Sequence, residues 1–128
     1  MKKKILIVDD EETNIRILQS LFHEDSFEIH IARDGQRGLE MAKELCPDLV
    51  LLDVMMPKVD GFKLCGLLKA DSRFKNIPIM ILSSRAGDND LELSKEVGAS
   101  AYLLKPIDKP KVAKEVNRIF NEVVLAEC

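Results

Sequence analysis

The run from Leu49 to Leu52 is the feature that most constrains how this chain can fold. Four apolar residues stand in a row between Asp48 and Asp53, and Pro57 follows four positions after the second aspartate. A short apolar run bounded by polar residues and a proline is typical of a strand buried on both faces, as in a parallel sheet. Asp53 then lies at the carboxyl end of that strand, where open α/β sheets place their binding crevice.

Strand and helix patterns alternate along the whole chain. A half-buried edge strand is predicted at 27–32, and further buried strands at 4–8, 77–82 and 101–104. Apolar residues at helical spacing follow each strand, the first such series reaching residue 22. Thr13 and Asp60 are predicted helix caps, and Gly98 a helix stop. Short loops and right-handed crossovers then predict one α/β domain, with a five-stranded parallel sheet covered by helices on both faces.

Length and composition exclude several classes of protein. The chain has 128 residues, of which 46% are hydrophobic and 32% charged, as expected for one folded domain. A net charge of −3 gives no electrostatic footprint for nucleic acid. No apolar run approaches the ~20 residues that a membrane span needs. We therefore expect a cytoplasmic protein that contacts neither nucleic acid nor membrane directly.

The cysteines indicate the redox environment. Cys46, Cys65 and Cys128 form no C-x-x-C pair, and their number is odd. This pattern favours reduced thiols over disulfides or a metal site. Cys46 and Cys65 fall on the apolar faces of predicted helices, so we expect both to fill the core.

Polar residues follow four of the five predicted strands, and the ends of parallel strands meet at one edge of the sheet. These residues are Asp9 and Asp10, Asp53, Ser83 and Lys105. Three close carboxylates repel each other unless a cation is present, and Mg²⁺ prefers such oxygen ligands. A carboxylate can also act as a nucleophile and form an aspartyl phosphate. Taken singly, Asp9 or Asp10 is equally well explained as a helix cap, and Asp53, Lys105 and Ser83 are better explained as a turn residue, a surface charge and a polar strand end; their joint occurrence favours a functional site.

Four motifs stand in order along the chain: Ile7-Val8-Asp9-Asp10-Glu11, Leu52 to Pro57 with Asp60-Gly61, Ile81-Leu82-Ser83, and Lys105-Pro106. Each motif is weak alone, but four at these separations are highly specific. Over nearly its whole length the chain resembles the receiver domains of bacterial two-component response regulators. The resemblance implies a doubly wound (βα)5, flavodoxin-like fold with strand order 2-1-3-4-5. It also implies that residues 1–128 form a single receiver domain, with no output domain in this chain.

The resemblance implies a role for each residue at the sheet edge. Asp53 matches the phosphoacceptor. Asp10, Asp53 and the backbone carbonyl of Met55 match the direct Mg²⁺ ligands, and Asp9 matches a residue that acts through water. Lys105 matches the residue that contacts the phosphoryl oxygens.

Further residues match the parts that convert phosphorylation into a signal. Ser83 corresponds to the switch hydroxyl and Tyr102 to the switch aromatic, although an aromatic on a strand face is by default structural. The bond that precedes Pro106 is expected to be cis. Ser84 and Ile107 depart from the small residue and the phenylalanine that are usual at their positions, which affects the expected rates rather than the essential chemistry.

The implied activity is phosphoacceptance, not enzymatic turnover, although the domain assists its own phosphotransfer and autodephosphorylation. The donor would be a sensor histidine kinase or a histidine phosphotransfer protein. Phosphorylation would switch a face formed by the helix at 91–97, the strand at 101–104 and the helix at 112–123. That face would contact a downstream protein, an output domain or, as a homodimer, a second copy. A stand-alone regulator and a receiver from a longer protein both stay open.

Three other classes fit less well. A flavodoxin-type FMN carrier needs a Ser/Thr/Gly-rich loop where this chain has Asp9 to Glu12. A phosphohydrolase with an aspartate nucleophile usually carries a second aspartate two residues later, where Met55 stands. A degenerate receiver that serves only as an interaction module would lack site residues, and all of them are present. Titration of the metal-free protein with Mg²⁺ would separate these classes.

Overall fold

The computed structural model describes residues 2–54, 60–84 and 88–122. Five strands and five helices alternate strictly along these ranges. In chain order they are β1 (Lys3–Val8), α1 (Glu12–Gln19), β2 (Phe27–Ala32), α2 (Gly35–Leu45), β3 (Leu49–Asp53), α3 (Gly61–Ala70), β4 (Ile79–Ser83), α4 (Asp88–Glu96), β5 (Ala101–Leu104) and α5 (Lys109–Glu122).

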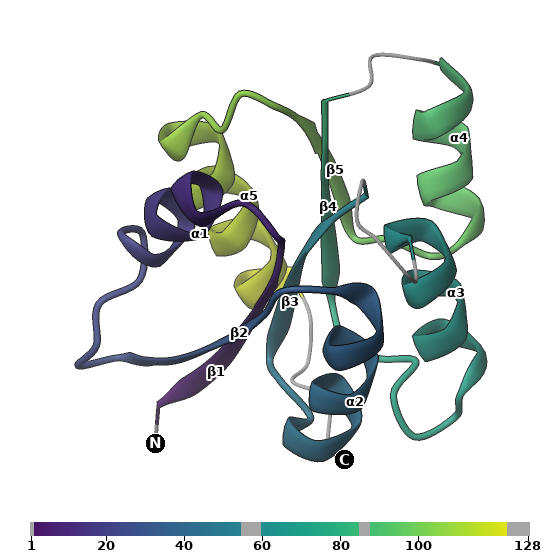
Figure 1. Ribbon diagram of the computed structural model, residues 1–128, viewed down its shortest axis with the longest axis horizontal. Helices are drawn as coiled ribbons and strands as arrows, with labels where there is room; N and C mark the ends of the chain where they lie inside the picture. Colours follow the sequence, from purple (N-terminus) through teal and green to yellow (C-terminus); the bar gives the residue numbers. More distant parts are fainter. Residues whose placement is uncertain (1, 55–59, 85–87, 123–128) are drawn as a thin grey trace.

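All five strands are parallel and form one sheet in the order β2-β1-β3-β4-β5, which confirms the expected topology. Helices α1 and α5 cover one face of the sheet, and α2, α3 and α4 cover the other (Figure 1). The chain therefore forms three layers, with β3 in the middle of the sheet.

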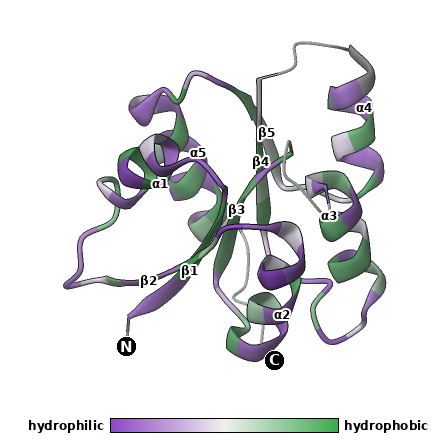
Figure 2. Ribbon diagram, in the orientation of Figure 1, coloured by the Kyte–Doolittle hydropathy of each residue, from purple (hydrophilic) through white to green (hydrophobic). Residues whose placement is uncertain are grey.

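The alternating side chains of the strands build two separate cores. On β1, Leu6 and Val8 point into the core beneath α2 and α3, whereas Ile5 and Ile7 point into the core beneath α1 and α5. Every residue of β3 is buried, as predicted from its unbroken apolar run. Figure 2 shows hydrophobic colour concentrated on the central strands of the sheet. Because each fully buried leucine or isoleucine contributes roughly 1.5–3 kcal/mol, the central strands are a major source of the stability of the fold.

The edges of the sheet differ from this centre. Strand β2 is half-buried at one edge, as predicted. The prediction of a buried strand at 101–104 is wrong, because β5 forms the opposite edge, its residues are only partly buried, and 49% of Leu104 is exposed. An apolar run of four residues has the same appearance in a central strand and in an edge strand.

Two of the predicted helix boundaries are confirmed and two are wrong. The Asp60 side chain accepts a hydrogen bond from the Lys63 main-chain N–H at 2.9 Å, so it caps α3. Gly98, with φ of +84°, follows the end of α4. Thr13 lies inside α1 and does not cap it, because the helix already begins at Glu12. The same helix ends at Gln19, before the predicted series of apolar residues ends.

The cysteines divide into two cases. Cys65 is free and buried, as expected. Cys46 is disulfide-bonded, so the prediction of a reduced thiol is wrong there. An odd number of cysteines requires one free thiol but does not exclude a bridge between the others. Within the described ranges, no helix combines the length and the hydropathy needed to cross a membrane.

Candidate functional site

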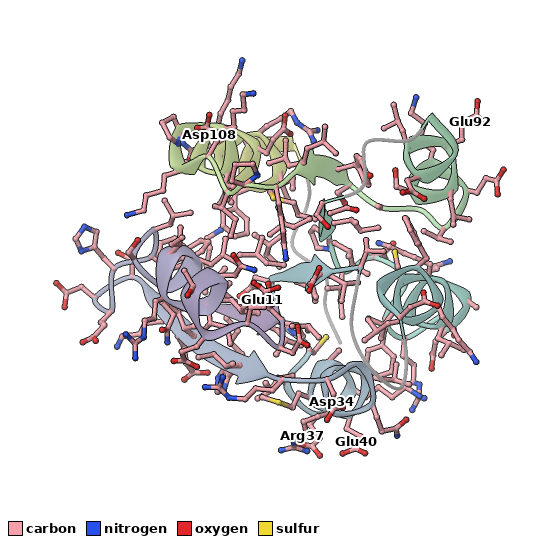
Figure 3. The ribbon with its side chains drawn as sticks, turned by 45° about the horizontal axis from the view of Figure 1, so that its top comes forward. Glu11, Asp34, Arg37, Glu40, Glu92 and Asp108 are labelled. Atoms are coloured by element: carbon pink, nitrogen blue, oxygen red, sulfur yellow. The ribbon has the colours of Figure 1, made fainter. Side chains whose placement is uncertain are left out.

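The carboxyl ends of four strands meet at one edge of the sheet, at the top of Figure 1. Asp9 follows β1, Asp53 and Ser83 are the last residues of β3 and β4, and Lys105 follows β5. Figure 3 turns this edge toward the viewer, with Glu11 marking the chain as it enters α1. The topology thus brings together the residues that the sequence placed at the strand ends.

Three carboxylates form a cluster at this edge. Asp9, Asp10 and Asp53 each contribute one oxygen, and these oxygens all lie within 4.8 Å of one another. Asp9 and Asp53 are 1% and 3% exposed, whereas Asp10 is exposed. Two of these carboxylates are buried and one is accessible to solvent. Such a cluster of oxygens suits a hard divalent cation that keeps part of its water shell.

Lys105 supplies positive charge to the buried pair. Its Nζ lies 3.2 Å from Oδ1 of Asp53 and 3.5 Å from Oδ2 of Asp9. The lysine side chain is 13% exposed, so all three groups interact in a poorly solvated environment. One ammonium group faces two buried carboxylates, and Asp10 adds a third negative charge at the rim. Counted over the described residues, the cluster therefore carries an excess of negative charge.

Burial dominates the protonation of Asp9. Loss of solvation raises the pKa of its carboxyl group, and the negative charge of Asp53 raises it further. The main-chain N–H of Glu11, 2.9 Å from Oδ1, and the charge of Lys105 lower the pKa but do not offset burial. The ionised form is thus kept at a free-energy cost, which a bound cation would relieve.

Main-chain hydrogen bonds hold these side chains in register. The Asp9 N–H donates to the carbonyl of Ala32 at 3.0 Å, and the Lys105 N–H donates to the carbonyl of Ser83 at 2.7 Å. Ser83 itself is fully buried. The peptide bond between Lys105 and Pro106 is cis, as the resemblance implies. The site is thus an extension of the sheet rather than a mobile loop assembly.

Tyr102, another of the expected site residues, is not a member of the carboxylate cluster. Tyr102 lies on β5 opposite Ile81 and packs, partly buried, against the core beneath α2 and α3. Met55, the expected carbonyl ligand, lies outside the described residues. The Glu11 N–H was not predicted as a partner of Asp9. The signal for it is the aspartate itself, because Asp side chains often accept a hydrogen bond from the main chain two residues later.

A comparison with protein families shows the family to which this chain belongs. The model of the response regulator receiver domain matches residues 5–117. The chain belongs to the response regulator receiver domain family. Receiver domains are phosphorylated on an aspartate, and they are phosphoacceptors rather than enzymes in the usual sense. The acidic cluster of this receiver domain is consistent with a metal-dependent phosphoacceptor site.

Relatives of this receiver domain include proteins of very different lengths. Response regulator PleD of Caulobacter vibrioides is 43% identical over 84% of this chain and 24% of its own length. The polar-differentiation response regulator DivK of Brucella ovis is 32% identical over 91% of this chain and 94% of its own. The transcriptional regulatory protein PhoP of Bacillus subtilis is 36% identical over 98% of this chain and 52% of its own length. The receiver domain thus spans about a quarter of PleD and about half of PhoP.

Solved structures agree with the fold. The receiver domain of a histidine kinase from Syntrophus aciditrophicus has a TM-score of 0.84 at 29% identity, covering 98% of this chain and 99% of its own. A structure of a CheX–CheY–BeF₃–Mg²⁺ complex from Borrelia burgdorferi also has a TM-score of 0.84. Its identity is 28%, and the match covers 92% of this chain and 89% of that chain.

Proposed function

We propose that Asp53 is the phosphoacceptor of this receiver domain and that Asp9, Asp10 and Asp53 hold Mg²⁺ beside it. The observation that carries the proposal is the position of Asp53 at the end of a buried strand, 3.2 Å from the Lys105 ammonium group and within the carboxylate cluster. The related CheY complex from Borrelia burgdorferi contains Mg²⁺ and BeF₃, a tetrahedral stand-in for a phosphoryl group. The carbonyl of Met55 is proposed, from the resemblance, as a further ligand.

In the proposed reaction, a carboxylate oxygen of Asp53 forms a bond to the donor's phosphorus atom. The bond from phosphorus to the donor's imidazole nitrogen breaks at the same time, and the electron pair leaves with the imidazole. Lys105 neutralises charge on the phosphoryl oxygens. The fixed end of the strand keeps the attacking Asp53 oxygen in line with the phosphorus atom and the leaving nitrogen. When bound, Mg²⁺ supplies positive charge to the same oxygens. In autodephosphorylation, a water oxygen bonds to phosphorus as the bond between phosphorus and the Asp53 oxygen breaks; the electron pair returns to the Asp53 carboxylate, and inorganic phosphate leaves with the protons of the water or passes one to solvent.

The partners are proposed from the family and from the surface beside the site. A cavity of about 970 Å³ opens next to Lys105, between Ile17 of α1 and Ile107 and Lys111 near the start of α5. Its apolar wall and lysines suit docking of a donor protein, which we propose to be a sensor histidine kinase or a histidine phosphotransfer protein. The receiver would then control a downstream protein or an output domain.

The proposed signal is a change in the surface formed by α4, β5 and α5. A phosphoryl group brings about two negative charges to Asp53, which would draw in the Ser83 hydroxyl and let Tyr102 turn inward. Exposed Leu91 and Leu104, on α4 and β5, give this surface apolar contacts for a partner or a second copy. Shifting an equilibrium from 1:99 to 99:1 takes about 5.5 kcal/mol. Charge-assisted hydrogen bonds at roughly 1.5–3 kcal/mol each are sufficient for that.

The test is a phosphorylation assay on the intact chain. The protein is incubated with Mg²⁺ and acetyl phosphate, and intact mass is measured. We expect a gain of one phosphoryl group that requires Mg²⁺ and is absent in Asp53→Asn. Asp108→Asn, which changes an exposed aspartate at the start of α5, is the matched control and should be modified normally. A full gain of mass in Asp53→Asn would overturn the assignment.

A further inference from the structure

Gly61, the first residue of α3, lies directly against the main chain of Asp53. A Cβ atom at position 61 would stand 2.6 Å from the Asp53 carbonyl oxygen and 2.8 Å from Cα of Val54. The Gly61 N–H also donates a hydrogen bond to the Val54 carbonyl at 3.1 Å. Gly61 is buried, so no solvent separates the helix from the end of β3. The first turn of α3 is therefore seated on the peptide unit that carries the phosphoacceptor.

The same peptide unit is held from its other side by β4. The Val54 N–H donates to the carbonyl of Leu82 at 3.2 Å. The next residue, Ser83, accepts the hydrogen bond from the Lys105 N–H, so β4 fixes both Asp53 and its cationic partner. The main chain that follows Asp53 is therefore hydrogen-bonded to β4 on one side and to the first residue of α3 on the other.

We infer that Gly61 is a positioning residue for the phosphoacceptor, an inference that rests on the function proposed for Asp53. Its missing side chain lets α3 approach closely enough to fix the Asp53 main chain, and through it the 3.2 Å contact with Lys105. The atoms that a Cβ would meet belong to the main chain, so they cannot rotate away as a side chain would. The shift passes either to α3 or to Asp53.

The size of that shift is comparable with the tolerance of a reactive site. The contact to the Asp53 carbonyl must lengthen by about 0.4 Å to reach 3.0 Å, below which real Cβ contacts are essentially never found. Reactive groups must be held to within about 0.5 Å of productive geometry, and a misplacement of ~1 Å can cost about 100-fold in rate. A methyl group at position 61 is therefore expected to reduce phosphorylation by at least about tenfold.

The same helix offers a matched control. At Gly66, one turn and a half later in α3, a Cβ would meet only Cγ1 of Val97, at an ordinary 3.9 Å. Gly66→Ala therefore makes the same chemical change in the same helix without touching the site. Phe22→Leu, in the core beneath α1 and α5, serves as a control for lost stability alone.

The experiment compares the wild type, Gly61→Ala, Gly66→Ala and Phe22→Leu under conditions where each is folded by circular dichroism. Two quantities are measured: the Kd for Mg²⁺ alone, by calorimetry, and the initial rate of phosphorylation by acetyl phosphate, by intact mass. Gly61→Ala should lower the initial rate of phosphorylation by at least tenfold, and it should raise the Kd for Mg²⁺. Gly66→Ala and Phe22→Leu should stay within twofold of the wild type in both.

The possible outcomes separate the inference from the proposed function. If wild-type protein is not phosphorylated at Asp53, both fail. If the wild type reacts and Gly61→Ala reacts equally well, only the inference is overturned. Should Gly61→Ala not fold, Asp60→Ala decides, because it removes the cap of α3 and loosens its first turn without adding an atom. A loss of at least threefold in its rate supports the inference, and an unchanged rate overturns it.

Discussion

The ammonium group of Lys105 is the only cation within 4 Å of the buried carboxylates in the described part of the chain, so replacing Lys105 by methionine tests the charge balance directly. Methionine keeps most of the side-chain volume and removes the charge. Asp9 and Asp53 are almost fully buried, and removing one partner from a buried ion pair typically costs 3–5 kcal/mol. We expect Lys105→Met to lower the free energy of unfolding of the metal-free protein by about that amount at pH 7. Such a loss is a large part of the roughly 5–15 kcal/mol that stabilises a domain.

The assay is urea unfolding followed by circular dichroism, because the chain has no tryptophan and only one tyrosine. The slope of the transition should stay unchanged, since the variant exposes no additional surface on unfolding. Combining Lys105→Met with Asp53→Asn should recover part of the loss, because the uncompensated charge is then removed. Saturating Mg²⁺ should also recover stability, by about 2.7 kcal/mol at 100 times its Kd.

The pH dependence gives this reasoning a second test. Without Lys105, the carboxylates are harder to ionise, so the deficit in stability should shrink as the pH falls and they become protonated. A loss below about 1 kcal/mol at pH 7, with no dependence on pH or Mg²⁺, would refute the reasoning. That result would mean that the two carboxylates are already neutral or hydrated in the metal-free protein.

Three further predictions follow from the altered pKa values. Burial raises the pKa of Asp9 above its usual 3.8, so the stability that Asp9 contributes to the folded state is complete below pH 3.8 and is lost as the pH rises. Without metal at pH 7, Asp9→Asn should therefore be more stable to urea than the wild type. The variant should also lose the stabilisation that Mg²⁺ gives the wild type. Burial raises the pKa of the Cys65 thiol to about 11, so alkylation by iodoacetamide at pH 8, followed by peptide mass, should require urea. Hydrogen bonds from Arg73 lower the pKa of Asp71 to about 2, so Asp71→Asn should lower the melting temperature at pH 7, and the difference should vanish as the pH falls toward 2.

The centre of the sheet and the composition of the site were predictable because topology determines both. A run such as Leu49–Leu52 has few environments in which all of its residues are buried, and a strand in the middle of a parallel sheet is one of them. Once the strands are parallel, Asp9, Asp53 and Lys105 must emerge at the same edge, whatever the details of the loops. The prediction of the acidic cluster thus depended on strand order and direction rather than on side-chain geometry.

The features that sequence analysis missed depend on three-dimensional contacts, which the spacing of residues along the sequence does not determine. The contact between Gly61 and the Asp53 carbonyl follows from how deeply α3 is seated on the sheet, and a glycine after a capping aspartate has the same appearance in an ordinary loop. The partial exposure of β5 follows from its place at the edge of the sheet, which the expected strand order already implied; the error came from interpreting its apolar run by itself. The disulfide at Cys46 was missed because neither the spacing nor the number of the cysteines reveals which thiols are oxidised.

At the carboxyl edge of the sheet, well-packed strands hold several carboxylates close together despite their repulsion. Ionised Asp9 costs free energy in the metal-free protein because burial raises its pKa, and a loop would relieve that cost by moving the carboxylate into water. Here the residues just before Asp9 and Asp53, Val8 and Leu52, are fully buried, so the strand ends cannot withdraw. The firm packing behind the site therefore keeps the carboxylates together, and a cation can lower their free energy only by binding between them. A cluster held in this way favours the metal-bound state without any change of fold, because binding relieves a repulsion that the sheet already maintains.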